Sequence, residues 1–168
     1  TAGNSSQITD GACVLLLASE EGLEEHGLTP IGKIVDLNWA GLDPKVMGLG
    51  PALAVPPMLE RHGMSLDQID YWELNEAFAA QVIGCLRAWE DKSFCQEHLG
   101  LEDALGSIDP TKLNVDGGAI AVGHPVGATG ARLVLQLLHT LERKGAQCGV
   151  ATLCIGGGQG GAILVETV

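Results

Sequence analysis

Aromatic residues and positive charges are both scarce in this sequence. Only 4% of the 168 residues are aromatic, and 9 Lys and Arg stand against 21 Asp and Glu, which gives a formal net charge of −12. Such an acidic chain is poorly suited to bind nucleic acid or an anionic membrane surface. An anionic small ligand is not excluded, because backbone N–H groups can bind one whatever the net charge.

Long apolar runs and paired cysteines are missing as well. No stretch reaches the roughly 18 apolar residues of a membrane-spanning helix, and no signal peptide is visible. The five cysteines are scattered without a C-x-x-C pair, so neither a metal site nor a disulfide framework is indicated. We therefore expect a reducing compartment and a cytoplasmic protein. The first residue is Thr1 rather than Met, which suggests a processed chain or a piece of a longer one.

The hydrophobic share of 46% suffices for one sizeable core, so we expect a single domain over residues 1–168. Apolar and β-branched runs predict strands over 12–18, 31–40, 69–74, 149–155 and 162–168. Helices are expected over 20–26, 51–61, 76–89 and 128–144, with Ser19 capping the first and Pro56-Pro57 kinking the second or delaying its start. This βαβαβαββ order predicts an α/β fold, a mixed five-stranded sheet with helices on both faces.

The stretch from Asn114 to Arg132 is unusually rich in glycine and contains His124 between Gly123 and Pro125. Glycine is needed where a side chain would block a tight turn or the close approach of a ligand. An imidazole on a stiff turn is well placed for proton transfer near neutral pH. The alternative is an ordinary glycine-rich loop with an incidental histidine.

A second stretch of interest lies where the predicted strand ends at Leu74 and a helix begins near Glu76. Asn75 then falls at the helix N-cap, a position that Asn favours for structural reasons alone. A side-chain amide at such a junction can also serve catalysis, because the helix N-terminus adds a positive field. From residue types, the capping role is favoured.

Two nucleotide-binding patterns are excluded. Gly156, Gly158 and Gly161 match G-x-G-x-x-G, but a dinucleotide site must lead into a helix, and here strand-like sequence follows. No Gly-Lys-Ser/Thr of a phosphate-binding loop occurs either. We expect this glycine run to join two antiparallel strands.

Three motifs together resemble the C-terminal half of the thiolase family. They are Asn75-Glu76-Ala77-Phe78, Gly123-His124-Pro125 and Cys154-Ile155-Gly156, and the opening TAGNSSQITDGA and the segment from Met47 to Pro51 are similar as well. The resemblance implies a protein of two similar α/β halves. It also implies an acyltransferase that cleaves 3-ketoacyl-CoA with CoA, or runs the reverse Claisen condensation of acetyl-CoA.

The resemblance assigns a role to each matching residue. His124 would take the proton of a nucleophilic cysteine, and Cys154 would be a second acid/base, which its thiol suits if neighbours lower its pKa modestly. Asn75 would hold a water that forms one oxyanion hole with His124, and the backbone N–H of Gly156 would serve another. Met47, Ala77 and Phe78 would line the acyl pocket. The resemblance implies CoA thioesters as substrates and no permanently bound cofactor.

The sequence departs from the family pattern in one important way. The acylated cysteine of thiolases lies in their N-terminal half, and this chain contains no equivalent, so we expect it to be inactive alone. Its partners would be acyl-CoA, CoA, the missing N-terminal half and further copies in a homodimer or homotetramer. The charged excursion Asp91–Pro110 resembles degradative, fatty-acid-oxidation thiolases, whereas the CIGGGQG run resembles acetoacetyl-forming ones.

Three other functions stay open at this point. The chain could be a non-catalytic acyl-CoA or lipid-binding module with a thiolase-like shell, although Asn75, His124 and Cys154 are all present. It could be a pure assembly domain, which would leave the glycine-rich loops unexplained. A hydrolase using Cys154 and His124 alone would need the two groups within hydrogen-bond reach.

Overall fold

The computed structural model describes residues 1–168, and its centre is a four-stranded mixed sheet with the strand order β1-β4-β3-β2. The strands are β1 (Lys33–Gly41), β2 (Tyr71–Leu74), β3 (Cys148–Ile155) and β4 (Gln159–Glu166). β4 runs antiparallel to both β1 and β3, whereas β2 and β3 are parallel. The α-helices are α1 (Glu20–His26), α2 (Gly50–Arg61), α3 (Ala79–Glu90), α4 (Lys92–Phe94), α5 (Ala119–Val122) and α6 (Val126–Lys144). The short 3₁₀ and π turns are η1 (Pro44–Leu49), η2 (Leu66–Gln68), η3 (Cys95–Leu99) and η4 (Pro110–Lys112).

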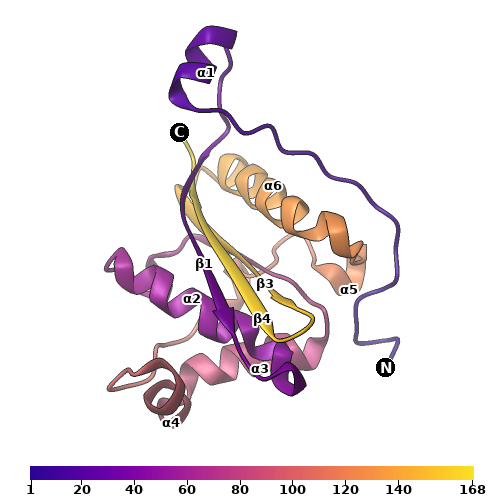
Figure 1. Cartoon of the computed structure of the whole chain (residues 1–168), viewed down its shortest axis with the longest axis vertical. Helices are drawn as coiled ribbons and strands as arrows, with labels where there is room; N and C mark the ends of the chain where they lie inside the picture. Colours follow the sequence, from indigo (N-terminus) through magenta and orange to yellow (C-terminus); the bar gives the residue numbers. More distant parts are fainter.

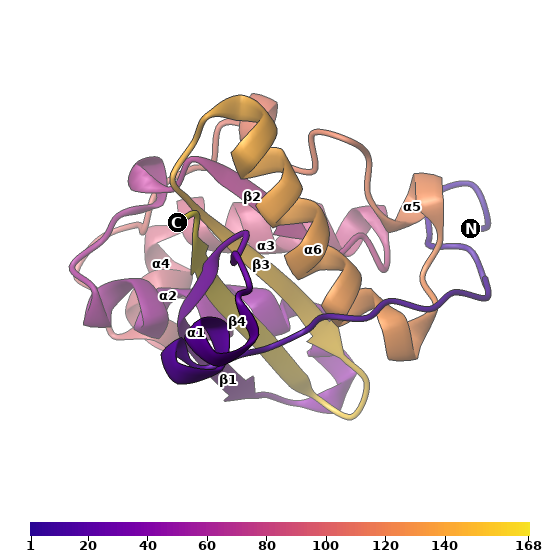
Figure 2. The same cartoon turned by 90° about the horizontal axis from the view of Figure 1, so that it is seen from above.

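Helices cover both faces of the sheet, as Figures 1 and 2 show. α6 lies on one face, where Leu133, Leu137 and Leu141 are each at most 1% exposed and pack against β3 and β4. The helical spacing of these leucines in the sequence predicted this face. The larger core lies on the other face under α2 and α3, and it contains the buried pair Trp72 and Trp89. None of the helices is both long enough and apolar enough to cross a membrane.

The α/β fold class with helices on both faces is confirmed, but the prediction of five strands is wrong by one. Residues 12–18 are extended without pairing to any strand, and Val14, Leu16 and Leu17 are 86, 79 and 72% exposed. Their segment runs past α5 and α6 rather than along the sheet (Figure 1). Strand propensity alone does not make a strand, because the backbone groups must find a neighbouring strand to bond.

The two prolines of α2 do not delay its start, and the helix is continuous through them. The helix runs from Gly50 to Arg61 with Pro56 and Pro57 inside. Pro56 lacks the N–H that would bond to the carbonyl of Ala52 one turn earlier. The indole Nε1–H of Trp89 on α3 donates to that carbonyl at 3.2 Å, so a long-range contact replaces the missing bond.

The capping role of Asn75 is also wrong. α3 begins only at Ala79, with Phe78 in the N-cap position, so the helix starts three residues later than predicted. In contrast, α1 has the predicted cap, because Ser19 accepts from the backbone N–H of Gly22, and Gly27 ends the helix in the left-handed conformation. The stretch between β2 and α3 is a loop that leaves the Asn75 side chain free for another partner.

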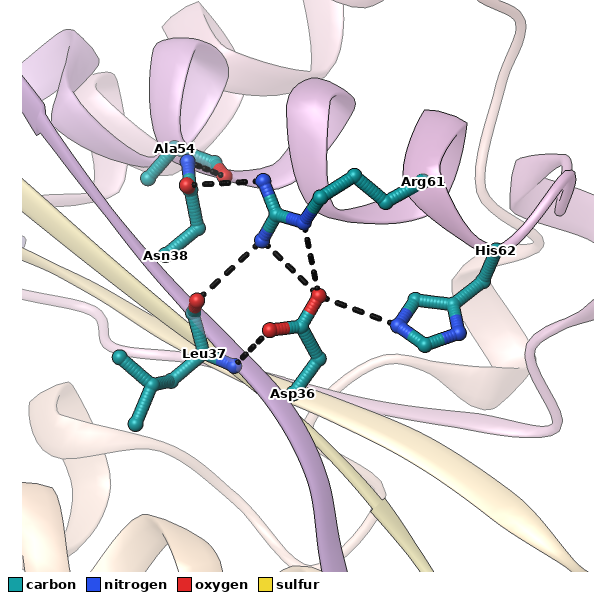
Figure 3. A network of polar contacts seen from close by, with 6 residues as sticks. All are labelled: Asp36, Leu37, Asn38, Ala54, Arg61 and His62. Carbon is teal, nitrogen blue, oxygen red and sulfur yellow. Dashed lines mark hydrogen bonds and ion pairs between the residues drawn. The ribbon is translucent and has the colours of Figure 1, made fainter.

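The edge strand β1 is tied to the end of α2 by a polar network around Asp36 (Figure 3). Arg61 Nε and Nη2 donate to Asp36 Oδ2 at 3.0 and 2.9 Å, and His62 Nε2 lies 3.0 Å from the same oxygen. Arg61 also donates to Asn38 Oδ1 and to the carbonyl of Leu37. Burial opposes ionisation of Asp36, but hydrogen bonds from the Leu37 N–H, Arg61 and His62 outweigh it and lower the carboxyl pKa. The network holds one edge of the sheet against the helix.

Candidate active site at the carboxyl edge of β2 and β3

The parallel pairing of β2 and β3 brings two of the predicted residues to one edge of the sheet. Leu74 at the end of β2 is in register with Thr152, and the N–H of Asn75 donates to the carbonyl of Thr152 at 2.9 Å. Cys154 lies two residues further along β3. Carboxyl ends of neighbouring parallel strands are a common location for ligand sites in α/β folds.

His124 reaches the same edge on the turn between α5 and α6. Gly123 has φ of 92°, in a region that a side chain disfavours, and it sharpens the turn before the histidine. His124 Nε2 lies 3.4 Å from Asn75 Nδ2, although the two residues are 49 positions apart in the sequence. The structure thus brings His124 together with the side-chain amide of Asn75, which the sequence had favoured as a helix cap.

The other ring nitrogen of His124 has a partner that the sequence did not reveal. Nδ1 lies 2.7 Å from the hydroxyl of Thr129, in the first turns of α6. Burial disfavours the charged imidazolium, and the positive charge of Arg132 adds to this effect, so the pKa of His124 falls below its ordinary value. The imidazole therefore stays neutral, and able to accept a proton, at lower pH than a free histidine.

The backbone before Asn75 is held by a neighbouring side chain. Asn114 Oδ1 accepts from the N–H of Leu74 and its Nδ2 donates to the carbonyl of Leu74, both at 2.9 Å, as an adjacent strand would. The same Nδ2 donates to Glu76 Oε1 at 2.9 Å, and the N–H of Ile120 in α5 donates to Glu76 Oε2 at 3.2 Å. Asn114 and Glu76 therefore fix the Asn75 loop against the segment that leads to His124.

Cys154 is buried at the end of β3, with 6% of its surface exposed. Burial raises the pKa of its thiol, and a backbone hydrogen bond only partly opposes the rise, so the residues of this chain alone do not supply the modest lowering that would suit an acid/base role. No hydrogen bond joins Cys154 to His124 or Asn75. The arrangement needed for a hydrolase that uses Cys154 and His124 alone is therefore absent.

Gly156 lies in the turn between β3 and β4, which are antiparallel as predicted. Its neighbours Gly157 and Gly158 both have φ of 89°, so this tight turn depends on glycine. Gly156 itself is exposed, which leaves its backbone accessible to a ligand at the same edge of the sheet as Cys154.

The three residues expected to line an acyl pocket differ in exposure. Met47 is half-buried in η1, Ala77 is 7% exposed and Phe78 is 47% exposed. A cavity of about 430 Å³ lies between α2 and residues 98–105, and none of the three lines it. The pocket role of these residues stays a prediction.

The N-terminal residues lie across the loops that carry Asn75 and His124. Ser6 N–H donates to the carbonyl of Ala77 at 2.9 Å, and the N–H of His124 donates to the carbonyl of Gln7 at 3.2 Å. This segment therefore links the two loops by backbone hydrogen bonds.

No group of three or more His, Cys, Asp or Glu residues is arranged to hold a metal ion.

Sequence reasoning missed Thr129, Asn114, the buried Glu73 and the half-buried Arg132. In the sequence, Asn114 and Arg132 stood out only as the two ends of the glycine-rich stretch. Nothing in the residue spacing distinguished Thr129 from its neighbours in that stretch. The positive φ of Asn114, 46°, is a conformation that Asn tolerates better than most residues, and an Asn two residues before Asp116-Gly117 was a weak signal for it.

Comparison with known proteins places this chain in a family. A family model for the C-terminal domain of thiolase matches residues 28–167. The beta-ketoadipyl-CoA thiolase of Pseudomonas aeruginosa is 48% identical over 168 residues, which are 100% of this chain and 38% of that protein. The crystal structure of the acetyl-CoA acetyltransferase of Bacillus anthracis matches with a TM-score of 0.82 and 43% identity, over 100% of this chain and 38% of that one.

The crystal structure of human mitochondrial 3-ketoacyl-CoA thiolase in complex with CoA also matches, with a TM-score of 0.83 and 36% identity, over 100% of this chain and 38% of that one. The chain thus spans less than two-fifths of the length of each of these three relatives. The family model, the sequence identities and the shared fold agree with the resemblance of the three motifs. The chain belongs to the thiolase family and carries its C-terminal domain.

Proposed function

We propose that this chain supplies the acid–base and oxyanion-binding part of a thiolase that acts on CoA thioesters of 3-keto acids. The observation that carries the proposal is the contact between Asn75 and His124, 3.4 Å apart at the edge of the sheet where Cys154 lies near the end of β3. A side-chain amide, a neutral imidazole and a thiol are groups that can stabilise an oxyanion and transfer protons.

The proposed reaction divides the work between two parts of the enzyme. A cysteine outside this chain gives its proton to His124, and its thiolate attacks the keto carbon of a 3-ketoacyl-CoA. The C–C bond breaks, and Cys154 donates a proton to the carbon of the departing acetyl-CoA enolate. The thiol of a second CoA then releases the acyl group from the cysteine, giving a shortened acyl-CoA. The reverse sequence is the Claisen condensation.

Two groups in the site are suited to the negative charge that develops on oxygen. Asn75 is fully buried and its Oδ1 has no protein partner, so it can accept a hydrogen bond from a bound water. That water and His124 would form one oxyanion hole, and the backbone N–H of Gly156 would form the second. A single donor of this kind is typically worth about 3 kcal/mol in the transition state.

The remainder of such a thiolase would be the partner of this chain. The uncovered face of β1 exposes Leu37 and Trp39, which are 53 and 64% exposed, and residues 12–18 expose a further apolar stretch. Exposed apolar surface of this kind marks an interface. We propose that the N-terminal half covers both and supplies the nucleophilic cysteine, that the assembled protein forms at least a dimer, and that it works in the cytoplasm.

The names of the relatives indicate the class of substrate. Their names include a beta-ketoadipyl-CoA thiolase, an acetyl-CoA acetyltransferase and a 3-ketoacyl-CoA thiolase. The common element is a CoA thioester with a keto group at C3 or the acetyl-CoA from which it is made. We propose acetoacetyl-CoA and longer 3-ketoacyl-CoA as the substrates to assay.

The test joins this chain to the N-terminal part of the Pseudomonas aeruginosa relative and measures thiolysis of acetoacetyl-CoA. We expect Cys154→Ala or His124→Ala to slow turnover by at least about a hundredfold, because each removes a group that moves a proton. Cys148→Ala, a buried cysteine at the other end of β3, is the matched control and should keep nearly full activity.

Wild-type rates in either the Cys154 or the His124 variant would overturn the assigned roles. Tight binding of acetoacetyl-CoA by the assembled wild type, with no turnover under any condition, would instead support the non-catalytic acyl-CoA-binding module.

A further inference from the structure

The hydroxyl of Thr129 lies between the imidazole of His124 and a backbone carbonyl. Thr129 is fully buried in the first turns of α6, with Oγ1 at 2.7 Å from His124 Nδ1 and 3.0 Å from the carbonyl oxygen of Pro125. The imidazole is thus held at Nδ1 by Thr129 and contacted at Nε2 by Asn75. Each contact constrains where the single proton of the neutral ring can be.

The Pro125 carbonyl fixes the direction of the first contact. The Thr129 hydroxyl donates its one proton to the carbonyl oxygen of Pro125, which also accepts from the backbone N–H groups of Ala128 and Thr129. The hydroxyl oxygen then offers a lone pair to His124, and Nδ1 must carry the ring proton and donate it.

The Asn75 contact leads independently to the same arrangement. Its amide nitrogen Nδ2 can only donate, so His124 Nε2, 3.4 Å away, must present a lone pair. The opposite tautomer would require both ends to invert together: the Asn75 amide would have to turn over, and the Thr129 hydroxyl would have to leave Pro125 and donate to Nδ1.

We propose that Thr129 is a positioning residue that holds His124 as the Nδ1–H tautomer, so that Nε2 is the atom that accepts a proton. The proposal rests on the proposed function in one respect only, namely that His124 acts as a base. Fixing the tautomer of a histidine through the hydrogen bond of its second nitrogen is a general way to set which nitrogen reacts.

Nitrogen NMR of the histidine ring tests the proposal on the 168-residue chain, without any need for activity. At a pH where His124 is neutral, long-range ¹H–¹⁵N spectra of the wild type should show a protonated Nδ1 and an unprotonated Nε2. A wild-type spectrum with the proton on Nε2 would overturn the proposal, and this measurement does not depend on the folding of any variant.

Three substitutions then identify the cause. Thr129→Val keeps the shape of the side chain but removes the hydroxyl, so the preference for Nδ1–H should be lost, and Thr129→Ser should restore it. Thr140→Val is the matched control, because Thr140 is also buried on α6 but bonds to Asp116 rather than His124. An unchanged tautomer in Thr129→Val, or an equal change in Thr140→Val, would show that Thr129 does not set it.

The assembled enzyme adds a kinetic measurement. We expect Thr129→Val to lower kcat about tenfold to a hundredfold with little change in KM, and Thr129→Ser to retain most of kcat. An inactive wild type with the Nδ1–H tautomer would reject the proposed function while keeping the positioning role. An active wild type whose kcat is unaffected by Thr129→Val would reject the positioning role alone.

Discussion

Single charged residues determine the proton affinities around the site. Glu73 on β2 is buried and Arg132 on α6 is half-buried, and Glu73 Oε2 and the Nε and Nη2 atoms of Arg132 are buried without a hydrogen-bond partner. Burial of the charge is the main reason why the pKa of Glu73 rises to about 7, with the carboxylates of Asp116 and Glu76 adding to the rise and Arg132 opposing it. The same positive charge of Arg132 adds to burial in lowering the pKa of His124.

Replacement of Arg132 should move the pKa of His124 in a known direction. Arg132→Met removes the charge but keeps an apolar stem, so the pKa of His124 should rise toward its ordinary value of 6.5 without reaching it, because burial still lowers it. An NMR titration of the His124 ring measures the change. Lys144→Met removes one positive charge from the far end of the same helix and should leave the titration unchanged. A fall in the pKa of His124 in Arg132→Met would contradict the electrostatic account.

Replacement of Glu73 should change how stability depends on pH. The carboxyl pKa is about 7 in the folded chain against 4.5 for the ordinary group, so the folded state binds the proton more tightly. Stability from this group is therefore fully present below pH 4.5 and is lost as the pH rises to 7. Glu73→Gln cannot ionise, so it should not lose this stability as the pH rises. The unfolding free energy of the variant minus that of the wild type should therefore increase between pH 5 and pH 8, by on the order of 3 kcal/mol at most.

Urea unfolding at the two pH values measures the gain in Glu73→Gln. Glu90→Gln, on the surface of α3, is the control and should show no comparable gain, because its carboxyl is exposed to water and paired only with Arg87. A Glu73→Gln variant that loses stability relative to the wild type as the pH rises would contradict the sign.

At the scale of elements, the site depends on a side chain that substitutes for a strand. Asn114 bonds to both backbone groups of Leu74 and to Glu76, and its own backbone has a φ of 46°. Strained conformations persist where the surroundings hold them, and they are frequent near functional sites. Here the strain is stored beside the loop that carries Asn75.

Two substitutions of Asn114 separate the lost hydrogen bonds from the backbone strain. Asn114→Ala and Asn114→Gly both leave the backbone groups of Leu74 without their partner, which should lower the unfolding free energy by about 2 kcal/mol or more. Glycine tolerates positive φ, so Asn114→Gly should be about 1 kcal/mol more stable than Asn114→Ala. Denaturant unfolding of the three proteins gives both differences. A more stable Ala variant would mean that the backbone is not strained there.

At the scale of the whole molecule, helices cover both faces of the sheet, but one part of the edge strand β1 is left exposed. α6 and α2 cover the sheet, but Trp39 and Leu37 on β1 remain uncovered, and α1 stands away from the body (Figure 1). The three tryptophans differ sharply for this reason: Trp72 and Trp89 are at most 1% exposed, whereas Trp39 is 64% exposed. Exposure of Trp39 therefore reports on whether a partner covers β1.

Acrylamide quenching of tryptophan fluorescence can follow this change. In the chain alone, Trp39 should be strongly quenched while Trp72 and Trp89 are protected. In the protein joined to an N-terminal thiolase half, Trp39 should become protected if the added half packs on β1 as proposed. Trp39→Phe should remove the quenchable signal from the isolated chain. Continued quenching of Trp39 in an active assembled enzyme would show that the other half binds elsewhere.

Local patterns in the sequence were sufficient for much of the fold. The period of the α6 leucines, the Ser19 cap and the glycine turn after Cys154 each depend on neighbours a few residues apart, and each appears as predicted. The glycine-rich motif around His124 likewise identified the turn that carries the imidazole. These features are determined by the sequence alone, because propensity, capping and turn geometry act over short stretches of chain.

Only the tertiary structure decided the features that depend on distant partners. Residues 12–18 have the composition of a strand but no neighbour to pair with, and the partner of Asn75 is His124, which lies 49 positions away. The hydroxyl that holds His124, the indole that replaces a missing bond in α2 and the burial of Glu73 all arise from packing between elements. Hydrogen-bond partners and desolvation are properties of the packed molecule, so they appear only once the elements have been brought together.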